Sequence, residues 1–283
     1  MIPLARAVLL RAVDYAGLFP PAGLSMASAV ANYRAHHAGA TRWALGRFVC
    51  PAARLEEFEA ELRPLDRGWQ LALTCAPDGV GPALAAISAF NQSRAGSAQA
   101  TALEAPFCAL KVLAAVPAAG LDLYCELDPS AQDFEAQARQ LKAIAVRAKL
   151  RTGGVTAAAI PSLALVLRFF EVSHRLQLPF KATAGLHHPV RGCHRLSYES
   201  GAAQAAMHGY LNLTLAAAVL QRGEPLAAAQ RMLECEEAAG LRLQDFHPDE
   251  IEAGRRLFVG FGSCSFEEPL QWLTSLSPIP ARP

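Results

Sequence analysis

Strand-like and helix-like segments alternate along almost the whole of this 283-residue chain. Short apolar runs of strand length are followed by longer runs of helix length, and only short turns separate them. Strands that alternate with helices of about 10–15 residues form parallel β/α units, because each helix carries the chain back to the start of the next strand. The sequence therefore predicts an α/β fold built on a parallel sheet.

Eight strands are expected, the first of them a weak candidate at residues 14–19. The other seven are predicted at residues 43–50, 70–75, 109–116, 121–127, 146–152, 179–186 and 208–215. Helices are predicted at residues 4–13, 25–37, 52–62, 81–93, 130–145, 162–176, 225–239 and 248–259, and residues 260–265 are interpreted as a helix stop. Eight such units in about 215 residues match the size of a (β/α)8 barrel.

The predicted fold is thus a single-domain (β/α)8 TIM barrel over residues 1–283, with an N-terminal helical segment and closing C-terminal helices. An open, doubly wound sheet is the main structural alternative. No G-x-G-x-x-G or G-x-x-x-x-G-K-[ST] motif follows an early strand, so the nucleotide-binding signatures of that alternative are absent from the sequence.

In the later strands, apolar and polar side chains alternate with a period of two. Ala148 and Leu150, for example, are expected on the face opposite Lys149 and Arg151. In a barrel the apolar face packs against the helices, so the polar face points inward, where charges must be paired or hydrogen-bonded. The polar side chains predicted to point inward, near the end of the barrel where active sites lie, are Glu126, Lys149, Arg151, Lys181, Thr183, His187, His208, Tyr210 and Asn212.

Two scarce lysines stand in similar contexts on neighbouring predicted strands. Only four of the 26 basic residues are lysines, and Lys149 and Lys181 each lie in a short strand followed by a turn that contains Thr and Gly. A desolvated lysine can lose its proton and attack a carbonyl carbon, whereas arginine stays charged. Two ammonium groups side by side also lower the pKa of one of them. The pattern therefore predicts a nucleophilic amine in a site with an excess of positive charge.

The other predicted side chains fit around such an amine. Glu126, His187 and Tyr210 are candidate general acids and bases, and the guanidinium fork of Arg151 suits a carboxylate or a phosphate. Asp14 is either an acid at the mouth of the barrel or a turn-forming residue. The expected substrate-binding residues are Arg151, Thr152, Gly153, Gly154, Thr183, His208, Asn212 and Asp14.

The segments Lys149-Leu150-Arg151-Thr152-Gly153-Gly154 and Lys181-Ala182-Thr183-Ala184-Gly185 resemble the two lysine strands of deoxyribose-phosphate aldolase-type class I aldolases. The resemblance implies that Lys149 forms a Schiff base, that Lys181 tunes it, and that the Thr152–Gly154 backbone lies near an anionic group. The expected function is a carbon–carbon lyase that acts on a small anionic carbonyl compound.

Two alternatives use the same barrel. Lys149-x-Arg151 is similar to the basic strand of the enolase superfamily, which would make the protein an acid/base isomerase or hydro-lyase. No cofactor is predicted, but a divalent metal held by Glu126, His187 or His188, and His208 would suit a metal-assisted variant of that chemistry. The second alternative is a non-catalytic barrel that binds an anion.

Composition restricts the partners. A net charge of +1 gives no support for binding nucleic acid or a membrane surface. The apolar stretch at residues 155–167 is shorter than the ~18 residues of a membrane span, and the N-terminus makes a poor signal peptide. Seven cysteines without C-x-x-C spacing indicate free thiols in a reducing compartment. We therefore expect a cytoplasmic protein that binds a small anionic molecule. The protein can also form a homo-oligomer.

Overall fold

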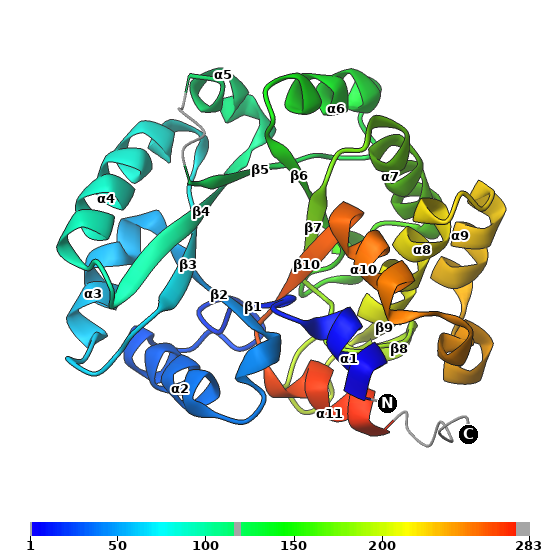
Figure 1. The fold of residues 1–283 in the computed structure, drawn as a ribbon, viewed down its shortest axis with the longest axis horizontal. Coiled ribbons are helices and arrows are strands. Elements are labelled where there is room, and N and C mark those ends of the chain that lie inside the picture. Colours follow the sequence, from blue (N-terminus) through cyan, green and yellow to red (C-terminus); the bar gives the residue numbers. More distant parts are fainter. Residues whose placement is uncertain (1, 116–119, 276–283) are drawn as a thin grey trace.

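Eight parallel strands close into a barrel in the computed structural model, which describes residues 2–115 and 120–275. Around the ring the strands follow the order β1-β10-β7-β6-β5-β4-β3-β2, and helices surround them on the outside (Figure 1). The strands are β1 Val13–Tyr15, β2 Leu45–Pro51, β3 Trp69–Thr74, β4 Ala98–Pro106, β5 Asp122–Glu126, β6 Arg147–Arg151, β7 Phe180–Thr183 and β10 Phe258–Ser263. The predicted single-domain (β/α)8 barrel is confirmed.

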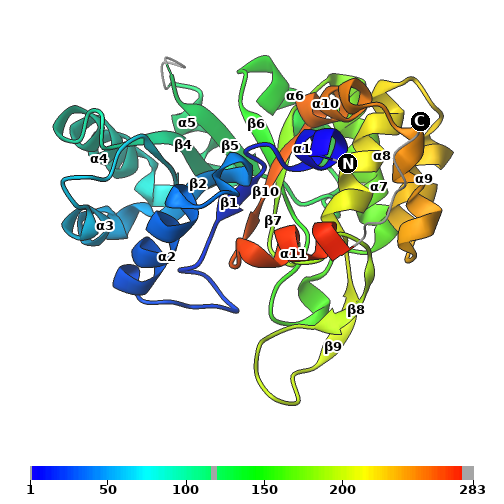
Figure 2. The same ribbon diagram turned by 60° about the horizontal axis from the view of Figure 1, so that its bottom comes forward.

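A short antiparallel hairpin lies outside the ring. Its strands, β8 Gly192–Arg195 and β9 Gln204–Met207, pair only with each other. Figure 2 shows the hairpin projecting from the end of the barrel at which β7 and β10 finish. The hairpin therefore extends the wall of the barrel on the side where active sites of this fold lie.

The helices of the outer layer begin and end close to the predicted positions in most of the chain. Ser25 and Ser162 cap the helices that follow them, since their side chains accept hydrogen bonds from the backbone N–H groups of Ser28 and Leu165. The helices are α1 Ile2–Leu9, α2 Met26–Ala38, α3 Leu55–Glu61, α4 Val80–Ser93, α5 Leu110–Leu113, α6 Phe134–Ala143, α7 Leu163–Leu176, α8 Tyr210–Gln221, α9 Leu226–Glu234, α10 Pro248–Leu257 and α11 Glu267–Ser275.

The fourth strand is not where the sequence predicts it. Residues 109–115 form a 3-10 turn, the short helix α5 and its end, while residue 116 lies outside the described residues. The strand is β4, whose sequence AQATALEAP is dominated by alanine. Alanine is a weak strand former, so local propensity gives little signal there, and pairing with β3 and β5 decides the conformation.

The eighth strand is also misplaced by the sequence prediction. Residues 210–215, predicted as part of a strand, belong to helix α8, and the strand that closes the barrel is β10, within the segment expected to be a helix end. Residues 210–220 are all buried in α8, so the helix has no polar face and no helical periodicity to detect. The alternation of residues 208–215 is compatible with a strand, but the packing of a fully buried helix overrides it.

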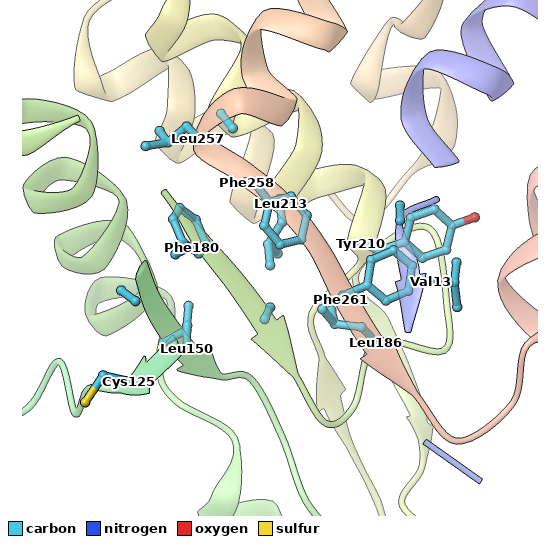
Figure 3. Close-up of a cluster of buried hydrophobic side chains, with 14 of the residues drawn as sticks. Val13, Cys125, Leu150, Phe180, Leu186, Tyr210, Leu213, Leu257, Phe258 and Phe261 are labelled. Atoms are coloured by element: carbon cyan, nitrogen blue, oxygen red, sulfur yellow. The ribbon is translucent and has the colours of Figure 1, made fainter. Parts of the chain in front are cut away.

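The main apolar core lies between the strands and the surrounding helices. Figure 3 shows Phe180 and Phe258 on the outer side of β7 and β10, beside Leu213 of α8. The Phe180 ring centroid lies 5.4 Å from that of Phe258 and 5.0 Å from that of Phe169 in α7. Inside the barrel the apolar cluster is small, and its buried members are Val49, Ala72, Ala102 and Tyr124. Charged side chains can therefore occupy the rest of the interior.

Helix α7 belongs to a segment with the composition of a membrane span. Ala157–Leu176 is the one stretch of the described residues that is long and apolar enough to cross a membrane, by length and composition alone. In this structure Val166, Phe169 and Phe170 of α7 are buried in the main core. One side of α7 therefore packs against the barrel.

Candidate functional site

The amino-terminal end of the barrel interior holds a separate group of charges. The carboxylate of Asp122 lies 2.6 Å from Arg47 and 2.8 Å from Arg147. Arg147 also donates to the hydroxyl of Tyr124, at 3.0 Å. Tyr124 belongs to the small apolar cluster, and its ring also lies 5.5 Å from Lys181 Nζ, so it stands next to the charges at both ends of the interior.

At the carboxyl-terminal end, six charged side chains from five strands form a continuous series of ion pairs of alternating sign. Lys181 Nζ lies 2.5 Å from Asp14 and 2.6 Å from Glu104. Lys149 Nζ lies 3.1 Å from Glu104 and 3.0 Å from Glu126, and Arg151 Nε lies 3.1 Å from Glu126. We call this series the ion-pair chain, and its order is Asp14, Lys181, Glu104, Lys149, Glu126, Arg151.

Parallel register sets the spacing of this chain. Lys149 pairs with Lys181 across β6 and β7, and Glu126 pairs with Lys149 across β5 and β6, so all three side chains point the same way. Lys181 reaches Asp14 across the intervening strand β10, which carries glycine at positions 260 and 262. A Cβ at Gly260 would lie 2.7 Å from the backbone carbonyl oxygen of Ala12, so glycine there lets β10 lie close to the first strand.

Asp14 is fixed by the strand next to it. Its Oδ1 accepts a hydrogen bond of 2.7 Å from the backbone N–H of Arg47. A Cβ at Gly46 would lie 2.3 Å from the same oxygen, so only glycine leaves room for this carboxylate. Asp14 therefore lies within strand β1 as an acid of the ion-pair chain, and it does not form a turn.

The balance of charge differs from the prediction of a positive excess. Three carboxylates, of Asp14, Glu104 and Glu126, face two lysines and one arginine in the ion-pair chain. Burial would raise the pKa of Glu104, but Lys181 and Lys149 outweigh it and hold that pKa at about 2. Burial would likewise lower the pKa of Lys181, but Asp14 and Glu104 raise it above its ordinary value. Lys181 is therefore a fixed cation, and the lowered pKa expected from crowding does not apply to it.

The ion-pair chain borders a cavity of about 310 Å³. Lys149, Glu104, Arg151 and Lys181 line it, and Thr183 lines it as predicted. The side chain of Lys149 is 11% exposed, compared with 3% for Lys181 and 52% for Arg151. Lys149 therefore lies at the surface of the cavity, with Lys181 behind it and Arg151 toward solvent.

His187 stands between this cavity and a second one of about 330 Å³ beside the β8–β9 hairpin. Its Nδ1 lies 2.8 Å from Glu268 of α11, and its Nε2 lies 3.8 Å from the sulfur of Cys264. Burial would lower the pKa of His187, but Cys264 and Glu268 outweigh it and raise that pKa to about 9. His187 thus lies next to the cavity that Lys149 lines, and its raised pKa favours the imidazolium form at neutral pH.

The turn after β6 contains Thr152, Gly153 and Gly154, and each of them makes different contacts. The Thr152 hydroxyl donates to the backbone carbonyls of Thr183 and Ala184, which ties the ends of β6 and β7 together. Gly153 approaches the backbone of Gly185 so closely that an added Cβ would lie 3.0 Å from its Cα. Gly154 lines both cavities. Of the three, Gly154 is the one placed to meet a ligand.

Three predicted site residues lie elsewhere, because residues 208–215 are not a barrel strand. Tyr210 donates through its hydroxyl to the backbone carbonyl of Pro269, and Asn212 donates to the carbonyls of Met232 and Cys235. His208 contacts the carbonyl of Pro161. These contacts stabilise the fold and keep the three side chains out of the site. The structure therefore does not support a catalytic role for Tyr210 or a binding role for His208 and Asn212.

Sequence reasoning missed Glu104, Cys264 and Glu268. The signal for Glu104 is a lone acidic residue within the alanine-rich segment 98–106. Cys264 follows β10, and Glu268 lies in the first turn of α11, so neither could be placed before the closing strand was identified.

The predicted metal alternative is not assembled. Among the residues that the structure describes, no group of three or more His, Cys, Asp or Glu side chains is arranged to hold a metal ion. Glu126 is paired with Lys149 and Arg151, while His208 lies against Pro161.

Comparisons of the chain with protein-family models, with curated proteins and with solved structures find no match.

Proposed function

We propose that the protein is a lysine-dependent carbon–carbon lyase of the aldolase type, in which Lys149 forms a Schiff base with a small anionic carbonyl compound. The observation that carries the proposal is the position of the Lys149 amine, at the wall of a cavity and within 3.1 Å of two carboxylates. A cavity of about 310 Å³ lies at the small end of ligand sites in proteins. A substrate with few carbon atoms suits it.

The two carboxylates supply the proton transfers that a Schiff base needs. The Lys149 amine must give up a proton before it attacks a carbonyl carbon, and Glu126, at 3.0 Å, is in place to accept it. The same carboxylic acid can return the proton to the hydroxyl of the carbinolamine, which then leaves as water. Glu104 is bound to Lys181 as well as to Lys149, so its negative charge is held in place to stabilise the iminium.

Lys181 has a positioning role in this proposal. Its ammonium lies between Asp14 and Glu104 and above the ring of Tyr124, with Nζ 5.5 Å from the ring centroid. An amine that is buried and charged is a poor nucleophile. Lys181 therefore orients Glu104, and through it Lys149, which agrees with the roles that the aldolase resemblance implies for the two lysines.

Arg151 and the turn after β6 suit the anionic part of a substrate. Glu126 engages the Nε of Arg151, and the guanidinium carries four further N–H donors. Two parallel N–H groups bind a carboxylate or a phosphate well. Gly154 lines the same cavity, so a ligand can come close to the backbone there.

Borohydride trapping tests the proposal. We expect reduction in the presence of small aldehydes and keto acids to add mass to the peptide that contains Lys149. Lys149→Arg keeps the positive charge and removes the primary amine, so it abolishes the adduct. Lys142→Arg is the matched control, because Lys142 is exposed and bonds the backbone carbonyl of Gln177. Absence of any adduct across the panel, or an adduct that survives Lys149→Arg, contradicts the assignment.

A further inference from the structure

The cavity that Lys149 lines also contains a thiol that the lysine chemistry does not use. Cys264 follows directly after β10 and is 6% exposed. Its sulfur lies 3.8 Å from His187 Nε2 and 3.6 Å from the hydroxyl of Tyr198, and Glu268 lies 2.8 Å from the other ring nitrogen of His187. A sulfur, an imidazole and a carboxylate thus stand in a row, the arrangement in which a base activates a nucleophile and a third group orients the base.

Three segments distant in sequence converge to build this row. Cys264 comes from the end of β10, Glu268 from the first turn of α11, and His187 from the turn after β7. In that turn Ala184 and Gly185 both have left-handed backbone conformations, with φ of 65° and 77°. A non-glycine residue in this region carries strain of about 1–2 kcal/mol, and such strain is found most often at functional sites.

Other cysteines of the chain show what a purely structural thiol looks like here. Cys50 and Cys125 are completely buried in the apolar core, and burial raises the pKa of each to about 12. Such thiols are chemically inert at neutral pH. Cys264 differs from both, because it faces a cavity and contacts a histidine.

The contacts of His187 place an N–H donor beside the sulfur of Cys264. With His187 protonated, Nδ1–H donates to Glu268 and Nε2–H points toward the sulfur. A cationic imidazole beside a sulfur stabilises the thiolate form, which is the nucleophile. Among the described residues, Tyr198 contacts the sulfur through its hydroxyl, Tyr15 is near enough for Cys264 to raise its pKa, and His188 helps to lower the pKa of Glu268.

We propose that Cys264, His187 and Glu268 form a nucleophilic thiol site, in which the sulfur of Cys264 adds to the carbonyl carbon of a small aldehyde. The reacting species is the thiolate of Cys264: its S–C bond forms as the C=O π bond opens, and the alkoxide takes the proton from His187 Nε2. The product is a thiohemiacetal and a neutral His187, and reversal of these steps releases the aldehyde. No oxidant or leaving group is needed, and the one proton donor required stands beside the sulfur.

This site goes beyond the proposed function and does not depend on it. The sulfur and the Lys149 amine line one cavity, so an aldehyde can be held by the thiol whether or not Lys149 forms a Schiff base. A protein with both groups could hold two carbonyl compounds, one on each nucleophile. Lys149→Arg removes the amine and Cys264→Ser removes the thiol, so these two variants separate the thiol site from the Schiff-base site.

Alkylation by iodoacetamide tests the activation of Cys264. We expect His187→Gln to slow the labelling of Cys264 at pH 7 by about tenfold or more, whereas the exposed Cys108 in the same samples is labelled at an unchanged rate. Glu268→Gln keeps His187 but removes the carboxylate that orients it, so it should also slow the labelling of Cys264 at pH 7. An unchanged labelling rate of Cys264 in His187→Gln overturns the proposal.

Binding of acetaldehyde labelled with carbon-13 at its carbonyl tests the addition step. We expect a tetrahedral, sulfur-bound carbon signal in the wild type and in Lys149→Arg, and its loss in Cys264→Ser. The aldehyde should also protect Cys264 from iodoacetamide, a readout that needs no substituted protein. A signal that persists in Cys264→Ser, or the absence of both signal and protection in the wild type, overturns the proposal. Borohydride trapping of Lys149 in Cys264→Ser tests the lyase proposal separately.

Discussion

Replacement of Glu104 by glutamine removes the one carboxylate that contacts both lysines of the ion-pair chain. The amide keeps the size of the side chain, Lys149 keeps Glu126, and Lys181 keeps Asp14. Neither ammonium group is left without a carboxylate. The effect therefore measures the charge of Glu104 itself, and it should appear first in the stability of the barrel.

The pKa of Glu104 gives the expected size. This pKa is about 2 in the folded protein and 4.5 without perturbation, and each unit corresponds to about 1.4 kcal/mol. The ionised carboxylate thus contributes about 3 kcal/mol to the free energy of unfolding at pH 7.

The same pKa fixes the pH dependence. Because the folded pKa lies below the unfolded one, the contribution is fully present above about pH 4.5 and is lost as the pH falls through about 2. The difference in unfolding free energy between wild type and Glu104→Gln should shrink from about 3 kcal/mol at pH 7 to roughly 1.5 kcal/mol at pH 3. Urea unfolding across this pH range measures it.

A thermal melt supplies the matched control. At pH 7 the melting temperature of Glu104→Gln should fall by roughly 6–12 °C. Glu57→Gln makes the same substitution in an exposed pair with Arg54, and it should leave the melting temperature close to that of the wild type. Equal shifts for the two variants, or a difference at Glu104 that does not shrink as the pH falls, would refute the electrostatic argument.

Three further predictions concern the surroundings of the site. Gly46→Ala should lower the free energy of unfolding by about 1–3 kcal/mol, since its Cβ would overlap the carboxylate of Asp14. Gly81→Ala in α4 places its Cβ in open space and should leave stability unchanged. Equal melting temperatures for the two variants contradict this. Tyr210→Phe should lower the free energy of unfolding by about 1–3 kcal/mol, because it leaves the buried carbonyl of Pro269 without its hydrogen bond. The borohydride adduct on Lys149 should still form, and its loss would indicate that Tyr210 belongs to the site. The interaction of protonated His187 with Glu268 stabilises the fold fully below pH 6.5, and this contribution is lost as the pH rises through about 9. The difference in melting temperature between wild type and Glu268→Gln should therefore become smaller from pH 6 to pH 10.

The sequence identified the polar face of three successive strands correctly. Glu126, Lys149 and Lys181 point into the barrel because side chains alternate along a strand and parallel register keeps neighbours level. The same reasoning failed for Tyr210 and Asn212. Alternation is informative only where the segment is a strand, and a helix buried on all sides has no pattern of its own.

The acids of the site depend on closure of the barrel. Asp14 lies 167 positions from Lys181 in the sequence, and Glu104 lies 77 positions from it. No local pattern links residues so far apart. Only the pairing of β10 with both β1 and β7 brings the first strand to the lysine strands, and β10 was hidden within a predicted helix end.

The α/β barrel and the placement of the two lysines on neighbouring strands could be predicted from the sequence, because both follow from periodicity within short segments. The partners and the burial of those lysines depend on the tertiary structure. It placed two further carboxylates around them, turned an expected positive cluster into a balanced chain of ion pairs, and left Lys149 at the cavity with Lys181 buried as a cation. The charge on a buried amine is set by the groups across the barrel, and those groups are neighbours only in three dimensions.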